Sequence, residues 1–157
     1  MKTLRSYTIS HLNALLMCAK HCEIPEILMD PELNDDQVQS IRDAYLEGIH
    51  IKLIEKFKSN PIRLRLIAEA CKNGHSEKAD ILCNPLYDNN QVEALIFGLD
   101  NDLDISIYSD PTIPDKIMKW ASEKLLIDPE NTKKVLDGIM KYIVDINAAE
   151  EEDDEYI

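Results

Sequence analysis

The residues of this chain best suited to metal chemistry are two cysteines and a histidine near its beginning. Cys18 and Cys22 lie four positions apart, with His21 next to Cys22. On a helix this spacing places both thiols on one face, and thiolate and imidazole are the preferred ligands of zinc. A complete site needs further ligands, and the candidates are Cys71, His75 and Cys83. We favour the alternative, in which reduced cysteines pack as small apolar residues, and we expect no metal or other cofactor.

Cys71 and His75 form a second cysteine–histidine pair with helical spacing. A catalytic thiol needs a neighbouring base, a third group that orients the base, and a pocket, and the sequence indicates only the first of these. We therefore favour His75 as a residue that caps carbonyl groups at a helix end. The chain also lacks the glycine-rich loops that bind nucleotide phosphates and the HExxH and GxSxG motifs of hydrolases. We expect that the protein is not an enzyme.

Two groups of charged residues are candidates for contact with a partner. Asp100, Asp102 and Asp104 alternate along one short segment. They resemble the start of a calcium-binding loop, but no glycine follows at the sixth position and no glutamate at the twelfth. We interpret them as helix caps and solvated turns, and as candidate partner-binding acids.

The second group is basic and lies between residues 52 and 65. Five lysines and arginines face the single acid Glu55 in this stretch. The pattern is compatible with a small patch that binds carboxylates of a partner or of the chain's own acidic end, or with an ordinary solvated helix surface. The candidate partner-binding residues here are Lys56, Lys58, Arg63 and Arg65.

Regularly placed prolines divide the chain into the elements that must position these residues. Five of the seven prolines follow Asp or Asn, at intervals of 30, 24, 26 and 18 residues. Proline cannot continue a helix, and it disfavours helical dihedrals in the residue before it. Each dipeptide is therefore expected to separate two elements. A period of about 26 residues is typical of solenoids and other repeat arrays.

Two of the resulting segments align at a constant offset of 54 residues. Asn34 and Asp88 occupy the same position in each copy and are good helix N-caps. Apolar residues follow at helical i, i+3, i+7 spacing: Val38, Ile41 and Tyr45 in the first copy, and Val92, Leu95 and Leu99 in the second. Gly48 and Gly74 are placed to end their helices in the left-handed conformation. The six residues 103–108 are too few for a stable α-helix and predict a single helical turn or a short 3₁₀ helix.

These patterns predict an all-α fold. The predicted helices cover residues 9–21, 35–47, 50–58, 62–73, 76–83, 88–100, 113–124 and 130–146. None can bury its apolar side alone, so we expect a short, α-solenoid-like array of helical repeats that forms one compact domain over residues 1–148. The acids at the end of the chain predict a disordered tail over residues 149–157.

The two aligned segments have a recognisable pattern. The first reads Asp30-Pro31-Glu32-Leu33-Asn34-x-x-Gln37-Val38-x-x-Ile41-Arg42-x-Ala44-x-x-x-Gly48-Ile49. The second reads Asn84-Pro85-Leu86-Tyr87-Asp88-x-x-Gln91-Val92, and it continues through Gly98-Leu99 to Leu103-Asp104-Ile105-Ser106-x-Tyr108.

Both segments resemble a helical repeat found in uncharacterised proteins of Firmicutes and of mobile elements. That repeat reads approximately Pro-x-Phe-Asn-x-x-Gln-Met-x-x-Ile-Arg-x-Gly-Leu-x-x-Gly-Leu-Asp-Val-Ser-x-Tyr-Ala. The second copy departs from the pattern where Asp102 replaces Gly48 and Ile96 replaces Arg42. The resemblance implies an interaction array and no activity. More loosely, and at the level of fold alone, the chain is similar to the α/3₁₀ solenoids of leucine-rich-repeat variants.

Charge indicates the kind of partner. The net charge is −13, and no apolar run is long enough to span a bilayer. We expect a cytoplasmic protein, of a bacterium or of a host cell, that binds neither nucleic acid nor membrane. The predicted function is a protein–protein interaction module whose partner has a basic surface. The alternative is a phage or mobile-element inhibitor of a host defence nuclease, similar to an anti-CRISPR, that mimics nucleic acid.

Overall fold

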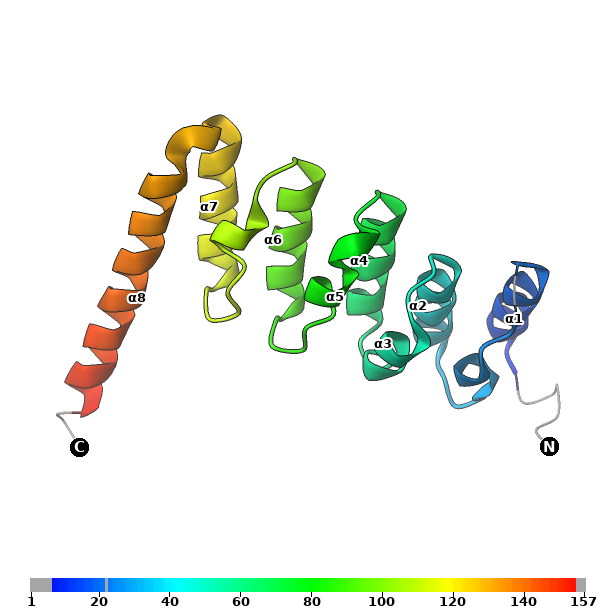
Figure 1. Ribbon diagram of the computed structural model, residues 1–157. Helices are drawn as coiled ribbons and strands as arrows, with labels where there is room; N and C mark the ends of the chain where they lie inside the picture. The colour runs from blue at the N-terminus through cyan, green and yellow to red at the C-terminus, as the bar shows by residue number, and fades with distance from the viewer. Residues whose placement is uncertain (1–6, 22, 155–157) are drawn as a thin grey trace. The chain divides into compact units, whose positions relative to one another are not determined.

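The computed structural model describes the backbone of residues 7–21 and 23–154, and the side chains up to residue 149. Within this described part every regular element is helical, so the predicted all-α fold is confirmed (Figure 1). The chain divides into two compact units, Met1–Pro85 and Leu86–Ile157. The residues predicted to form one domain are thus divided between two units.

The first unit is built around helix α2. It contains α1 (Ile9–His21), the 3₁₀ helix η2 (Glu26–Met29), α2 (Asp35–Leu46), α3 (Ile51–Lys56), α4 (Pro61–Lys72), η3 (Ser76–Lys78) and α5 (Ala79–Leu82). Helix α2 packs against α1 on one side and α4 on the other. The second unit contains α6 (Asn89–Asp100), η4 (Ile105–Ile107), α7 (Asp115–Ile127), η5 (Pro129–Asn131) and α8 (Thr132–Asp154), with α7 packed against both α6 and α8.

Helices α2 and α6 begin in the same way, as the aligned sequences predict. The side chain of Asn34 accepts a hydrogen bond from the Gln37 amide at 2.8 Å, and the side chain of Gln37 accepts one from the Asn34 amide at 2.9 Å. Asp88 and Gln91 make the same reciprocal pair, at 2.7 and 2.9 Å. This capping box satisfies backbone donors that the first helical turn leaves without partners.

Three helices also end alike. The amides of Ile49, His75 and Leu103 each donate to a carbonyl five residues earlier, at 3.1, 2.9 and 2.9 Å. The residue before each of them, Gly48, Gly74 or Asp102, has a positive φ of 82°, 95° or 55°. This is the Schellman arrangement, in which a left-handed residue lets the chain turn back over the last carbonyls. The predicted glycine caps are confirmed, although the assignment of the whole chain to repeating units stays a prediction.

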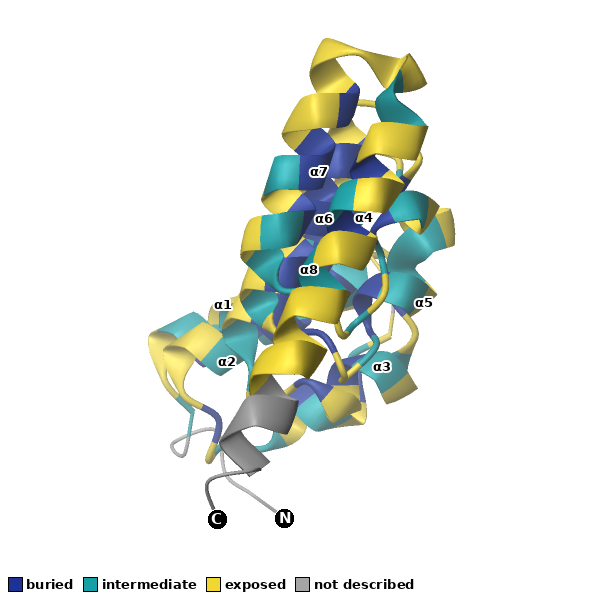
Figure 2. Ribbon diagram, turned by 90° about the vertical axis from the view of Figure 1, so that its left-hand side faces the viewer, coloured by how far each residue is buried: buried dark blue, intermediate teal, exposed yellow. Residues whose placement is uncertain are grey.

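The predicted apolar stripes form the cores of the two units. Val38 and Ile41 in α2 and Val92 and Leu95 in α6 are all 0% exposed. Figure 2 shows the buried residues as dark blue bands along the helices. The Asp-Pro and Asn-Pro dipeptides lie between elements or at the start of one, as Pro61 of α4 and Pro129 of η5 do. Asp30, Asp110 and Asp128 each accept a hydrogen bond from the amide two residues later, at 3.0, 2.9 and 3.0 Å. These local bonds end one element and start the next.

Helix α8 is longer than expected. It runs to Asp154, so the backbone is helical through most of the segment predicted to be a disordered tail. Between Ile139 and Asp154 the sequence has no glycine or proline, and Ala148 and Ala149 are strong helix formers. Residues 155–157 lie outside the described residues. No helix in the described part of the chain combines the length and the apolar character needed to cross a membrane.

Candidate acidic groove

Two of the predicted acidic residues line a groove in the second unit. The groove has a volume of about 420 Å³. Asp102 and Asp104 supply its charge, and most of its other lining residues are apolar, notably Leu103, Ile107 and Leu126. The full lining consists of Asn101, Asp102, Leu103, Asp104, Ile107, Leu125, Leu126, Pro129 and Thr132. We call this surface the acidic groove, because its lining contains carboxylates and no basic side chain.

The two carboxylates of the acidic groove are positioned in different ways, Asp104 by hydrogen bonds and Asp102 by its backbone conformation. Asp104 is the N-cap of η4, and its Oδ1 accepts from the amide and the hydroxyl of Ser106 at 3.1 and 2.5 Å. Asp102 occupies the left-handed position after α6, and it is the one non-glycine residue in the described part of the chain with a positive φ. Both side chains are exposed, as is that of Asp100 at the end of α6, which lies outside the groove lining.

Helix α6 packs tightly against η4, which supplies Ile107 to the acidic groove. Gly98 faces Tyr108 so closely that an added Cβ would overlap the tyrosine hydroxyl, and it would lie 2.8 Å from Cγ2 of Ile105. Tyr108 is 0% exposed, and its hydroxyl has no hydrogen-bond partner within the described residues. Burial, with a smaller contribution from the Asp104 carboxylate, raises the pKa of Tyr108 to about 12.

A glutamine fixes the loop that follows η4. Gln91 Nε2 donates to the carbonyl oxygens of Pro111 and Ile113 at 2.9 and 2.7 Å, while its Oε1 completes the capping box of α6. One buried side chain thus ties the start of α6 to the chain that leads into α7. The sequence pattern indicates the cap but not this second role, because the loop residues that it contacts carry no motif.

The predicted basic patch is not assembled in the structure. Arg63 is only 2% exposed. It donates to the carbonyl oxygens of Leu82 and Asn84, both at 3.2 Å, and lies 5.0 Å from the centre of the Phe57 ring. It links α4 to the end of α5, so we correct its assignment: the guanidinium holds backbone carbonyls inside the unit and does not face a partner.

The three other basic candidates are exposed, and two of them lie beside acids. Arg65 forms an ion pair with Asp36 at 2.9 Å. Lys58 lines a depression whose other charged residues are Glu26, Asp30 and Glu55. Lys56 is exposed at the end of α3. The run of basic residues in the sequence therefore does not form one patch, because Arg63 is buried and Arg65 and Lys58 lie beside carboxylates.

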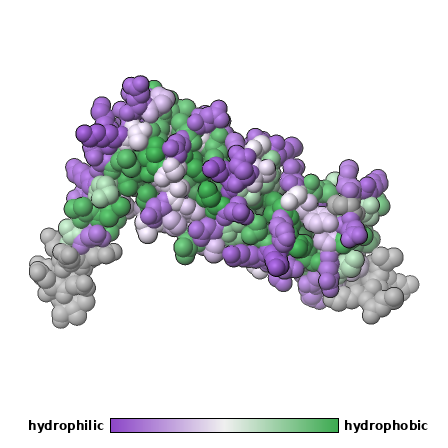
Figure 3. All heavy atoms as spheres, in the orientation of Figure 1, coloured by the Kyte–Doolittle hydropathy of each residue, from purple (hydrophilic) through white to green (hydrophobic). Residues whose placement is uncertain are grey.

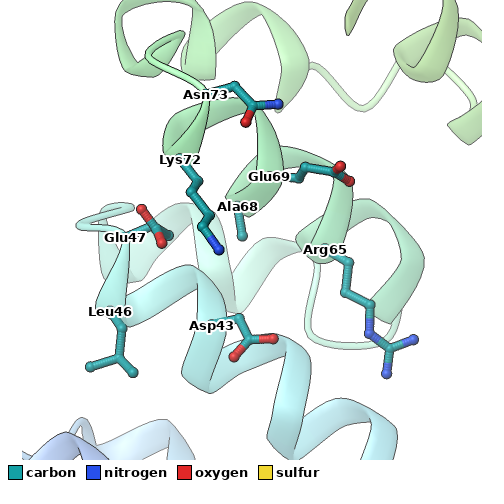
Figure 4. Close-up of a pocket in the computed structure, with 8 residues that line it drawn as sticks. All are labelled: Asp43, Leu46, Glu47, Arg65, Ala68, Glu69, Lys72 and Asn73. Carbon is teal, nitrogen blue, oxygen red and sulfur yellow. The ribbon is translucent and has the colours of Figure 1, made fainter.

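A larger groove lies between α2 and α4 in the first unit, with a volume of about 470 Å³. Figure 4 shows Asp43, Glu47 and Glu69 around it together with Arg65 and Lys72. Asp43 accepts from Arg42 at 2.8 Å. Because its charges are mixed and several are paired within the chain, this groove has no single charge for a partner to complement.

The cysteines do not form a reactive or metal-binding cluster among the described residues. No group of three or more His, Cys, Asp or Glu side chains there is arranged to hold a metal ion. Cys18 is buried and His21 is exposed, while Cys22 lies outside the described residues. Burial, and secondly the charge of Glu47, raises the pKa of Cys71, and burial raises that of Cys83 to about 11. Both shifts favour the neutral thiol over the nucleophilic thiolate.

Comparisons of the chain with protein-family models, with curated proteins and with solved structures gave no match. The geometry of the chain itself must therefore support any functional conclusion.

Proposed function

We propose that this chain is an interaction module that binds a protein partner through the acidic groove. The observation that carries the proposal is the combination of exposed Asp102 and Asp104 with the apolar side chains of Leu103, Ile107 and Leu126. The partner is a segment with lysine or arginine beside an apolar side chain. The apolar part gains from burial, and the basic part gains from the two carboxylates.

The backbone at Asp102 supports this assignment. A left-handed conformation is costly for a residue with a Cβ atom, and Gly48 and Gly74 occupy the corresponding positions of the other helices. Asp102 contributes charge to the groove at the expense of backbone strain. Strained positions of this kind are concentrated at functional sites.

The proposal is tested by neutralising the carboxylates without changing the backbone. Asparagine tolerates the left-handed conformation and is a good N-cap, so Asp102→Asn with Asp104→Asn should preserve the fold. A matched control, Glu77→Gln with Asp80→Asn, removes the same charge from exposed positions of the first unit. We expect affinity capture from the native cell, followed by mass spectrometry, to recover a partner with the unchanged chain and the control, and to lose it with the groove variant. Equal recovery with all three chains would refute the proposal.

A second candidate function is inhibition of a nucleic-acid-binding host protein by mimicry of its substrate, which the net charge of −13 favours. A mimic spreads its contacts over many acids. Its binding would weaken by a similar factor with the groove variant and with the control. It would also fall steeply between 0.1 M and 1 M salt, where the screening length shrinks from about 10 Å to about 3 Å. An apolar groove with two flanking carboxylates predicts a weaker salt dependence, and a much larger loss of binding with the groove variant than with the control.

A further inference from the structure

Helix α8 carries a second apolar face that no described element covers. Val135 and Ile139 are 1% and 4% exposed, in keeping with the packing of α8 against α7. In contrast, Leu136, Met140 and Val144 are 43%, 58% and 59% exposed. They follow each other at i, i+4 and i+8, so they form one ridge along the helix. Figure 3 shows hydrophobic atoms at the surface of this helix.

A ridge of alternating charge runs beside the apolar ridge. This ridge is also spaced by four residues and consists of Lys133, Asp137, Lys141 and Asp145. The last three directly follow the apolar residues at 136, 140 and 144, and Lys133 lies one turn before Asp137. All four are exposed. The order of charge along the helix is therefore plus, minus, plus, minus. Two such helices side by side in register place opposite charges together only when they run in opposite directions.

We propose that α8 pairs antiparallel with α8 of a second copy of this chain, about a two-fold axis near Met140. In this register Lys133 faces Asp145 of the other copy and Asp137 faces Lys141, so the two-fold axis creates four ion pairs. The same register interdigitates the apolar ridges: Leu136 lies between Met140 and Val144 of the other copy, and the two Met140 side chains adjoin each other at the axis. A parallel arrangement would put like charges opposite each other, which is unfavourable. The apolar ridge supplies the attraction and the charged ridge determines the direction.

The small size of the surface determines the kind of dimer. Two helix faces bury less than the roughly 1,200 Å² of a standard stable interface, so the association is reversible and depends on concentration. This inference is independent of the acidic groove. A partner bound there and a second copy bound at α8 would use different residues of the second unit.

Reversing one charge and then its proposed mate tests the register. Lys133→Asp brings two acids together across the two-fold axis, and we expect the dimer dissociation constant, measured by analytical ultracentrifugation of the full chain, to rise by about tenfold or more. Adding Asp145→Lys restores opposite charges between the copies. Within each helix, however, the double variant has like charges at 133 and 137 and at 141 and 145. Recovery of the dimer therefore cannot come from repair of the single helix.

Cysteines introduced at two equally exposed ridge positions test the two-fold axis. Met140→Cys places two thiols at the axis and should give a disulfide-linked dimer under mild oxidation. Val144→Cys, the matched control, lies beside position 136 of the other copy and far from its own counterpart, so it should not cross-link beyond the level of the unchanged chain with its own cysteines. The proposal is overturned if the chain remains monomeric at high micromolar concentration, if the double charge reversal fails to recover dimerisation, or if position 144 cross-links as readily as position 140. Circular dichroism confirms that each variant is folded.

Discussion

At the scale of single residues, Tyr108 carries a polar group that is unfavourably buried. Its hydroxyl is buried without a partner in the described structure. A buried hydroxyl that loses its water contacts without gaining a hydrogen bond costs about 1–3 kcal/mol. We expect Tyr108→Phe to leave the free energy of unfolding unchanged or to raise it by about 1 kcal/mol, as measured by urea denaturation at neutral pH. A clear loss of stability would show that the hydroxyl has a stabilising contact.

The same tyrosine predicts a dependence of stability on pH. Burial raises its pKa in the folded chain from 10.0 to about 12. The neutral phenol is favoured by the fold, so its contribution is fully present below pH 10 and is lost as pH rises toward 12. Tyr108→Phe should reduce the fall in the free energy of unfolding over this range, and denaturation at pH 9.5 and pH 11.5 measures the difference. The remaining fall reflects other groups, including Tyr87, whose pKa burial also raises. An identical fall in both chains would contradict this assignment.

Asp102 lowers the stability of the fold through its backbone conformation, while its carboxylate adds charge to the acidic groove. Its φ of 55° is a conformation that glycine adopts without cost. We expect Asp102→Gly to raise the free energy of unfolding by about 1 kcal/mol and to weaken binding at the acidic groove. Gly48→Ala is the reference change: an added Cβ there meets no atom within 4 Å, so its cost, about 1 kcal/mol, is purely conformational. Equal stability of Asp102→Gly and the unchanged chain would show that the aspartate side chain compensates for the strain.

At the scale of elements, the capping boxes make the clearest prediction. Replacing Asn34 or Asp88 by alanine removes the acceptor for the third helical amide, and each change should lower the free energy of unfolding by about 1 kcal/mol. Asn90→Ala, in the exposed first turn of α6, leaves the cap intact and should change stability by less than about 0.5 kcal/mol. Thermal denaturation followed by circular dichroism compares the three variants. Similar losses for Asn90→Ala and the cap variants would rule out a special role for the boxes.

The contact between α7 and α8 depends on a glycine. A Cβ added to Gly138 would overlap the Trp120 ring. We therefore expect Gly138→Ala to lower the free energy of unfolding by about 1–3 kcal/mol, although alanine is the better helix former. Replacing the exposed Ala148 by glycine, a change in the opposite direction on the same helix, tests propensity alone and should cost about 1 kcal/mol or less. A Gly138→Ala chain as stable as the unchanged one would show that α8 can shift without loss.

The helices were predictable because they depend on local rules. Proline spacing, N-caps and apolar periodicity place most of the predicted helices within a few residues of their observed bounds. The helix predicted over residues 76–83 is instead the 3₁₀ helix η3 followed by the short α5, and the expected short element within residues 103–108 is the 3₁₀ helix η4. The prediction of a disordered tail at the end of α8 was wrong because it considered only the charge of the acids. The alanines before them and the absence of glycine and proline favour a helix. The site was only partly predictable. Asp102 and Asp104 stand out by charge, but Leu126 and Thr132 join them through tertiary packing.

The error at Arg63 has the same origin. Arginines at 63 and 65 are equivalent in a linear sequence, yet the rotation of α4 buries the first and exposes the second. A burial pattern would have indicated this, since residue 63 adjoins the buried Leu64 and lies four positions before Ile67 on the inner face. Arginine was assigned to the surface because charged residues are rarely buried without partners. Here backbone carbonyls and an aromatic ring provide the partners.

At the scale of the whole molecule, the proposed function assigns different roles to the net charge and to the acidic groove. We expect a net charge of −13 to favour encounters with basic proteins over encounters with nucleic acid at low salt. Charge alone gives no selectivity, because acids occur on both units. The acidic groove adds an apolar contact at a defined place, and apolar contacts persist when salt screens the charges.

The most direct test of the claim that a partner binds at the acidic groove is to place a photoreactive side chain there. Substitution at Leu126, which lines the groove and is 47% exposed, is compared with substitution at Ile62 on α4, which is 58% exposed. On irradiation in the native cell, we predict a protein adduct from position 126 that disappears when Asp102 and Asp104 are changed to asparagine, and no such adduct from position 62. Adducts from both positions alike, or an adduct at 126 that persists in the asparagine variant, would contradict the account.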